Sequence, residues 1–259
     1  MESEIKLLQG DCLELMKDIP NKSVDMILCD LPYGTTACKW DNVIPFEPLW
    51  EQYNRIIKDN GAIVLFGSEP FSSKLRLSNL KMYKYDWIYE KSKATLFTQC
   101  KKRPLNSHEY ISVFYKKSPI YNPQMRDREK PRISKNKGTT RQFLCSNGKE
   151  YVGKKPLDKK YPITVLEFGN DNQKEKQHPT QKPVALLEYL IRTYTNHGET
   201  VLDFTMGSGS TGVACVNTNR NFIGIELDEG YFNIAKKRIE EAWERGKVVE
   251  AWNRRADNG

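Results

Sequence analysis

The sequence lacks most of the features that mark membrane, secreted or metal-binding proteins. Its longest strongly apolar run is residues 62–66, far short of the ~20 residues that a membrane span needs. The N-terminal residues show no basic segment followed by an apolar stretch, so no secretory signal is predicted. Six cysteines occur without a C-x-x-C pair, which argues against a zinc site or a disulfide framework. We therefore expect a cytoplasmic protein that has no metal and no membrane partner.

Acidic residues are scarce in the middle of the chain. Residues 91–176 contain 21 Lys or Arg against 8 Asp or Glu, a charge of +13, so the remainder carries −5 of the overall +8. A basic segment in an otherwise acidic protein favours a polyanionic partner laid across that segment. A solvated, lysine-rich insertion would give the same composition.

Short apolar runs alternate with amphipathic segments along the rest of the chain. The runs predict strands at residues 24–29, 61–67, 85–89, 110–115, 200–204 and 221–226. Helices are predicted at residues 46–59, 183–194 and 231–243, the first of them ending at Asn60-Gly61. This alternation indicates an α/β protein with a mostly parallel sheet covered on both faces.

Residues 118–177 break this rhythm and are rich in Lys, Arg, Asn, Gly and Pro. Only residues 161–168 have even a weak strand pattern. Sixty residues are too many for a plain connection inside a compact domain. We therefore expect this stretch to be a functional insertion or to be partly disordered.

A glycine-rich turn, DFTMGSGST, follows the strand that ends at Asp203. Gly207 and Gly209 allow positive φ and let a ligand approach the backbone closely. Glu226 ends the next strand, 23 residues after Asp203, about where an acid reaches a ribose hydroxyl. Dinucleotide-binding proteins use a similar turn, but Asp203 would repel a pyrophosphate and could accept hydrogen bonds from an ammonium group. The turn therefore favours S-adenosylmethionine over NAD.

The tetrapeptide Asp30-Leu31-Pro32-Tyr33 follows the first predicted strand. Strand carboxyl ends line the binding crevice of an open α/β sheet, so Asp30 should face it, and Pro32 stiffens the turn. An exocyclic base amine is a poor nucleophile because its lone pair is delocalised into the ring. The Asp30 carboxylate and the Leu31 carbonyl could accept its two N–H groups while Tyr33 stacks on the base. Such a base must first be flipped out of the duplex.

These motifs together resemble those of the circularly permuted β group of DNA amino-methyltransferases. In chain order they are GDCL at residues 10–13, DLPYG at 30–34, HPTQKP at 178–183, the turn DFTMGSGST and the acid Glu226. The resemblance covers roughly residues 5–118 and 177–243. It implies a three-layer, Rossmann-like methyltransferase fold with permuted motif order. Leu31 departs from the family's usual proline, but the carbonyl it supplies is unchanged.

The resemblance also implies a role for each matching position. The catalytic residues would be Asp30, Leu31, Pro32 and Tyr33. Asp11 would lie near the adenine of the cofactor, Glu226 at its ribose, and Thr180, Lys182 and Pro183 at its methionine end. The full set expected to bind S-adenosylmethionine is Asp11, Asp30, Thr180, Lys182, Pro183, Asp203, Phe204, Thr205, Gly207, Ser208, Gly209 and Glu226.

The family's target-recognition region lies between the two motif blocks. The resemblance thus divides the chain into a catalytic part at 1–117, a basic recognition insertion at 118–177 and a cofactor-binding part at 178–259. Double-stranded DNA is the expected partner, and a homodimer and a cognate restriction enzyme are possible further ones. The candidate readers of guanine are Arg126, Arg128, Arg132 and Arg141, although for any single one of them an exposed position or a phosphate contact is the favoured interpretation. Lys39, Trp40 and Asp41 could contact DNA, although Trp40 could equally be a packing residue.

An aspartate in the tetrapeptide is commoner among adenine-N6 enzymes of this family, so adenine N6 is the predicted target. Cytosine N4 is the first alternative. Methylation of an RNA amine or a protein amide is a second, against which the permuted order and the basic insertion speak. A DNA-binding module with a decayed cofactor site is a third, disfavoured because both acids and both glycines of the cofactor motif are intact.

Overall fold

A computed structural model describes residues 3–34, 41–95, 97–128, 158–169 and 181–256. The chain forms two compact units. The larger comprises Met1–Asn122 and Thr164–Gly259, and the smaller comprises Pro123–Ile163. In the smaller unit, the short strands β6 (Arg126–Asp127) and β7 (Lys159–Lys160) pair in antiparallel fashion.

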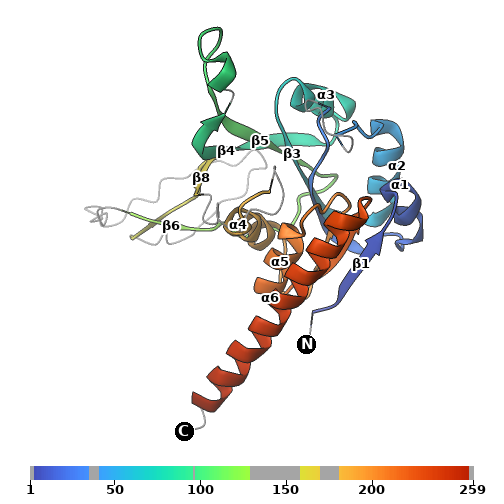
Figure 1. The fold of residues 1–259 in the computed structure, drawn as a ribbon, viewed down its shortest axis with the longest axis vertical. Helices are drawn as coiled ribbons and strands as arrows, with labels where there is room; N and C mark the ends of the chain where they lie inside the picture. The colour runs from blue at the N-terminus through green and yellow to red at the C-terminus, as the bar shows by residue number, and fades with distance from the viewer. Residues whose placement is uncertain (1–2, 35–40, 96, 129–157, 170–180, 257–259) are drawn as a thin grey trace, which may run out of the picture. The chain divides into compact units, whose positions relative to one another are not determined.

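The larger unit is built on an eight-stranded sheet (Figure 1). Its strands in chain order are β1 (Ile5–Gln9), β2 (Val24–Asp30), β3 (Ile57–Gly67), β4 (Tyr83–Thr95), β5 (Asn106–Phe114), β8 (Val165–Phe168), β9 (Thr200–Asp203) and β10 (Asn221–Glu226). They lie in the order β1-β10-β9-β2-β3-β5-β4-β8, and five of the seven pairings are parallel. The expected mostly parallel sheet is confirmed.

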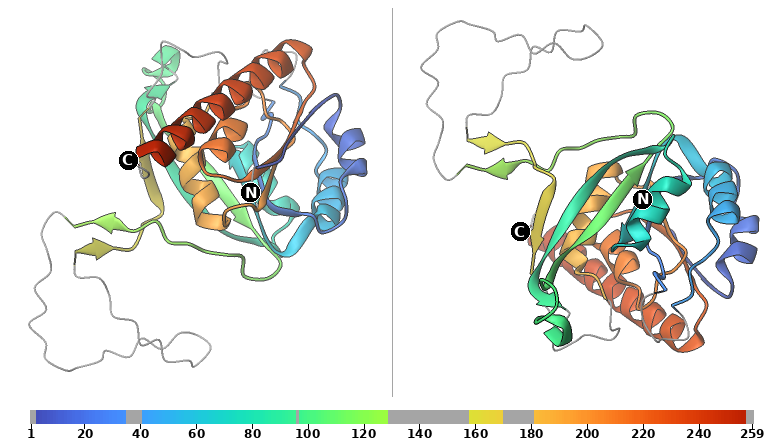
Figure 2. Two further views of the ribbon diagram at one scale, coloured as in Figure 1. Left: turned by 90° about the horizontal axis from the view of Figure 1, so that it is seen from below. Right: turned by 90° about the horizontal axis from the view of Figure 1, so that it is seen from above.

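Helices cover both faces of this sheet, as the two views of Figure 2 show. In chain order they are α1 (Cys12–Leu15), the 3-10 turn η1 (Met16–Asp18), α2 (Phe46–Ile56), α3 (Phe71–Ser78), the 3-10 turn η2 (Phe97–Gln99), α4 (Val184–Tyr194), α5 (Ser210–Asn217) and α6 (Glu229–Ala256). Within the described residues, none of these helices is both long and apolar enough to cross a membrane.

Successive residues of β2 face two separate hydrophobic cores. Met26 and Leu28 pack in the core beneath α4, α5 and α6, whereas Ile27 and Cys29 pack in the core beneath α1, α2 and α3. This alternation follows from the two-residue period of a strand. Because both faces are covered, all four side chains are buried, and the segment is continuously apolar rather than alternating.

Several expected boundaries were wrong. The helix expected over 46–59 ends at Ile56, and β3 begins at Ile57 instead of near Gly61. Sheet pairing outweighs helical periodicity here, because Ile57 pairs with Val24 of β2. The last helix runs over Glu229–Ala256 rather than 231–243. The strand at Val165–Phe168 joins the edge of the main sheet beside β4, although it falls within the expected insertion.

Candidate active site

A cavity of about 770 Å³ lies at the carboxyl ends of the parallel strands. Residues at or just after the ends of β1, β2, β9 and β10 line it, together with residues of β5 and the start of α4. β9 and β2 are neighbours in the middle of the sheet, and the chain continues from β9 to β10 on one side and from β2 to β3 on the other. Ligand sites of open α/β sheets lie at such a reversal of strand order.

The expected catalytic tetrapeptide lines this cavity in full. The Tyr33 hydroxyl donates a hydrogen bond to Asp30 Oδ1 at 2.5 Å. The Tyr33 ring packs against Phe71 of α3, with ring centroids 5.1 Å apart and planes inclined by 31°. Thr205, which follows β9, donates through Oγ1 to the Asp30 carbonyl at 3.1 Å. The turn after β2 is thereby fastened both to α3 and to the end of β9.

Asp30 is the end of a chain of alternating charges. Lys182 Nζ lies 2.5 Å from Asp30 Oδ2 and 3.1 Å from Glu109 Oε2. Lys91 Nζ lies 2.6 Å from Glu109 Oε1. The Lys182 side chain is only 8% exposed, against 24% for Asp30. A buried ammonium is stabilised only when it is paired, and the two flanking carboxylates provide that pairing.

The environment shifts the pKa of each central group. Burial raises the pKa of the Asp30 carboxyl above its ordinary value, and the Lys182 ammonium opposes this. Burial acts in the same direction on Glu109, but Lys182 and Lys91 outweigh it and hold the pKa of Glu109 below its usual range. Burial would lower the pKa of Lys182, but the two carboxylates outweigh it and raise that pKa. Lys182 therefore stays charged at neutral pH.

The glycine-rich turn carries positive φ at both expected glycines, 52° at Gly207 and 78° at Gly209. The Gly207 N–H donates to Glu226 Oε2 at 2.8 Å, so the turn rests on the acid that ends β10. A Cβ at Gly209 would lie 2.8 Å from Ala235 Cβ. Gly209 lies outside the cavity lining and lets α5 start close against α6, whereas Gly207 lines the cavity.

Asp203 is only 3% exposed. Its Oδ2 accepts a hydrogen bond from Thr211 Oγ1 at 2.6 Å, and its Oδ1 accepts one from the Thr205 N–H at 3.1 Å. Burial raises the pKa of Asp203 to about 7, although both hydrogen bonds oppose the shift. This carboxyl group therefore changes charge near neutral pH.

The remaining expected cofactor residues are placed as follows. Asp11 lines the cavity and caps α1 by accepting from the Leu13 N–H at 2.8 Å. Pro183 is the N-terminal cap residue of α4 and lies outside the lining. Thr180, Lys39, Trp40, Arg132 and Arg141 lie outside the described residues. The cavity lining includes Asp11, Asp30, Lys182, Asp203, Phe204, Thr205, Gly207, Ser208 and Glu226.

Sequence reasoning missed three polar residues near this cavity. Glu109 and Lys91 come from β5 and β4, and Arg238 of α6 donates to Ser208 Oγ at 3.0 Å. The only sequence signal for Glu109 is its position next to an apolar run that predicts a buried strand, where an acidic residue is unusual. Asp41, named only as a possible DNA contact, lines the cavity, is 6% exposed and accepts from the Gly34 N–H at 2.8 Å.

The carboxyl groups that line this cavity suit a cationic ligand that carries hydroxyl groups. Asp11, Asp30, Asp203 and Glu226 place four carboxyl groups around one cavity. Such a set would repel phosphates and would attract an ammonium or sulfonium group. The fold and this site together define the class of methyltransferases that use S-adenosylmethionine.

The comparisons with known proteins agree with this class. Residues 24–237 match the family model described as DNA methylase, so the chain belongs to the DNA methylase family. Type II methyltransferase M.HpaI of Haemophilus parainfluenzae is 27% identical over 271 residues, covering 98% of this chain and 80% of that protein.

Two solved structures have similar folds. The M1.HpyAVI–SAM complex has a TM-score of 0.62 at 29% identity and covers 91% of this chain and 98% of its own. PvuII DNA methyltransferase, described as cytosine-N4-specific, has a TM-score of 0.63 at 16% identity, and the match covers 95% of this chain and 93% of the PvuII chain. The second likeness is one of fold alone. The family and fold expected from the motifs are confirmed.

Proposed function

We propose that this protein methylates the N6 amine of adenine in DNA, at a base flipped into the cavity beside Asp30. The observation that carries the proposal is the common cavity. It brings the Asp30 tetrapeptide together with Asp203 and Glu226, the two acids of the cofactor motif. A methyl donor and an amine held there would be neighbours, and the site would accelerate the reaction by aligning the two reactants.

The cofactor-binding residues have distinct tasks in this proposal. Glu226 would accept hydrogen bonds from the ribose hydroxyls, and Asp11 would lie beside the adenine. Asp203 and Lys182 would hold the methionine end, the carboxyl of Asp203 attracting the ammonium and the Lys182 cation attracting the carboxylate. S-adenosylmethionine, when bound, supplies an electrophilic methyl group on a sulfonium. Thr180, Pro183 and Gly209, expected from the motifs to take part, stay predictions.

Asp30 acts on the attacking amine. As the N–C bond forms and the S–C bond breaks, positive charge grows on the amine nitrogen. The Asp30 carboxylate and the Leu31 carbonyl accept its two N–H groups and favour that charge. Lys182 and Tyr33 each engage one Asp30 oxygen, which fixes the carboxylate while further lone pairs stay available. The proton then passes to water.

Asp30→Ala tests this role. Methyl transfer to unmethylated genomic DNA should fall at least ~100-fold, the usual effect of removing a group aimed at developing charge. DNA binding should change little. The variant should fold, because Lys182 keeps Glu109 as a partner. Asp59→Ala is the control, since Asp59 is exposed, lies outside the cavity lining and pairs with Lys22 and Lys117. Near-normal turnover of Asp30→Ala would refute the role.

The choice of adenine over cytosine rests on the aspartate at position 30 and on the family resemblance. Nucleoside mass spectrometry of DNA methylated by the purified protein separates the two. N6-methyldeoxyadenosine supports the proposal, and N4-methyldeoxycytidine would overturn it. Single-molecule sequencing of DNA from a methylation-free host that expresses the protein would also give the target sequence.

Four expectations extend beyond the reaction itself. We propose that Arg126 and Arg128 of the smaller unit take part in target recognition, as part of the 118–177 insertion. A cognate restriction enzyme is proposed from the likeness to type II methyltransferase M.HpaI. The homodimer and the cytoplasmic location stay predictions, which sedimentation and fractionation would test.

A further inference from the structure

The β4–β5 hairpin extends past the edge of the sheet at which Asp30 lies. Asp30 pairs with Phe66 of β3, and Phe66 pairs with Ile111 of β5. β5 runs antiparallel to β3 and begins at Asn106, five residues before Ile111, where it pairs with Thr95. At ~3.4 Å per residue the paired strands reach roughly 17 Å beyond the level of Asp30. Figure 1 shows this hairpin projecting from the sheet.

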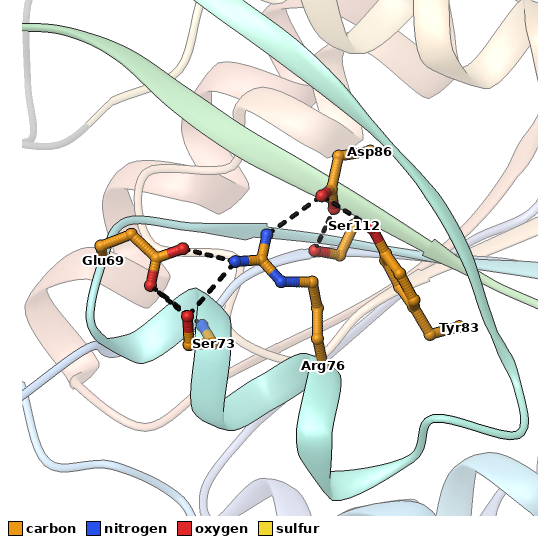
Figure 3. A network of polar contacts seen from close by, with 6 residues as sticks. All are labelled: Glu69, Ser73, Arg76, Tyr83, Asp86 and Ser112. Carbon is orange, nitrogen blue, oxygen red and sulfur yellow. Dashed lines mark hydrogen bonds and ion pairs between the residues drawn. The ribbon is translucent and has the colours of Figure 1, made fainter.

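A polar network fixes the base of the hairpin (Figure 3). Arg76 of α3 bonds Glu69 and, at 3.0 Å, Asp86 of β4. Asp86 also accepts from Ser112 Oγ of β5 at 2.6 Å. The Arg76 guanidinium lies over the Tyr110 ring at 5.0 Å from its centroid. Both strands are thus held to α3, and the projecting part starts from a fixed support.

The tip of the hairpin is ordered by its own backbone hydrogen bonds. It begins with η2, and the N–H groups of Lys102 and Arg103 both donate to the Gln99 carbonyl, at 2.8 and 3.0 Å. The backbone of Lys102 and Arg103 is therefore held in a defined turn. Phe97, which begins η2, is 65% exposed beside them.

The charge of this tip is of one sign. Residues 92–105 contain four Lys or Arg and no Asp or Glu. Lys101, Lys102 and Arg103 are exposed, and none forms an ion pair with a described residue. Some exposed lysines of the larger unit do pair with acids, for example Lys17 with Glu14 and Lys117 with Asp59. An unpaired cationic cluster favours a polyanion as its partner.

We propose that Lys101, Lys102 and Arg103 bind the DNA phosphate backbone that flanks the base held at Asp30. This inference rests on the proposed function, because the substrate at Asp30 must be DNA. The hairpin projects roughly 17 Å beyond the level of Asp30, a distance comparable with the ~12 Å width of the major groove. The tip can therefore reach phosphates beside a base held at Asp30. Three adjacent cations on a short tip suit phosphate contacts, which hold the duplex in place without reading its sequence.

The test is the triple variant Lys101→Gln, Lys102→Gln, Arg103→Gln in the full chain. Each phosphate contact contributes ~0.9 to the slope of log affinity against log salt. Losing three contacts makes the slope shallower by about 2.7. When the salt concentration rises fourfold, the DNA affinity of wild type should therefore fall by a factor about 40 times larger than the affinity of the variant does. Fluorescence anisotropy with a 30-base-pair duplex of random sequence measures this slope. The KM for genomic DNA should rise, with kcat and S-adenosylmethionine affinity within about twofold of wild type.

The matched control is Lys81→Gln, Lys84→Gln, Lys117→Gln. It makes the same change of charge at exposed lysines near the opposite ends of the same two strands: Lys81 precedes β4, Lys84 is its second residue and Lys117 follows β5. A control that keeps the wild-type slope while the tip variant loses it supports the proposal. Equal slopes in the two variants would overturn it. If wild type transfers no methyl group but the tip variant still loses salt dependence, the proposed function fails and the binding surface stands.

Discussion

Asp203→Asn tests whether the raised pKa of the buried Asp203 carboxyl affects both the free energy of unfolding and the affinity for the cofactor. In wild type the pKa of Asp203 lies at about 7 rather than at the ordinary 3.8 of an aspartate, because the carboxyl is buried. The variant keeps the shape of the side chain. Its amide oxygen can accept from the Thr205 N–H, and its amide nitrogen can donate to Thr211 Oγ1, at the positions of the present partners. The main change is the loss of a titrating group.

The expected effect on stability follows from linkage. The folded state holds the Asp203 proton more tightly than the unfolded chain does. The resulting stability is fully present below pH ~4 and is lost as pH rises through about 7. At ~1.4 kcal/mol for each pH unit between the two pKa values, the loss approaches 4 kcal/mol. The free energy of unfolding of Asp203→Asn, relative to wild type, should therefore rise by up to ~4 kcal/mol between pH 4 and pH 8.

Cofactor binding should respond in the opposite sense. Only ionised Asp203 attracts an ammonium group, so the affinity of wild type for S-adenosylmethionine should fall by up to ~10-fold per pH unit below pH 7. Asp203→Asn should bind weakly and lack this dependence. Urea denaturation at pH 4, 5, 6, 7 and 8 measures the first effect, and isothermal titration calorimetry at pH 5, 6, 7 and 8 measures the second. A stability difference that does not vary with pH would refute the reasoning about burial. Wild-type cofactor affinity that is constant over this range would refute the role given to Asp203.

Two further predictions concern the neighbourhood of the cavity. Lys182→Met leaves Asp30 and Glu109 without their shared cation. It should lower the free energy of unfolding by about 3–5 kcal/mol and move the acid limb of the methyl-transfer pH profile to higher pH. Lys182→Arg should retain most of the stability. An unchanged free energy of unfolding for Lys182→Met would contradict this prediction. Gly209→Ala places a Cβ 2.8 Å from that of Ala235 at a φ of 78° and should cost about 1–3 kcal/mol in chemical denaturation. Gly246→Ala, with no atom within 4 Å of the added Cβ, is the control and should show no such loss.

The sequence by itself determined the strands that lead into the two acids of the site. The apolar run that becomes β2 leads directly into Asp30, and β9 leads into Asp203. Because parallel strands end on one edge of a sheet, side chains at these two ends were expected to share a site, and both line the cavity. The positive φ at Gly207 was also readable locally, since only glycine adopts it without strain.

Only the tertiary structure decided which charges meet. Lys182 comes from the segment just before α4, Glu109 from β5 and Lys91 from β4. Strand order makes β4 and β5 neighbours, and the fold brings the distant Lys182 to them. No local pattern encodes that adjacency. The same holds for Ile57, whose pairing with Val24 overrides a helical period, and for Asp203, whose pKa is raised by burial in the folded protein. Local periodicity predicts the kind of each element, whereas strand pairing sets several of their ends, and burial sets the electrostatics of the site.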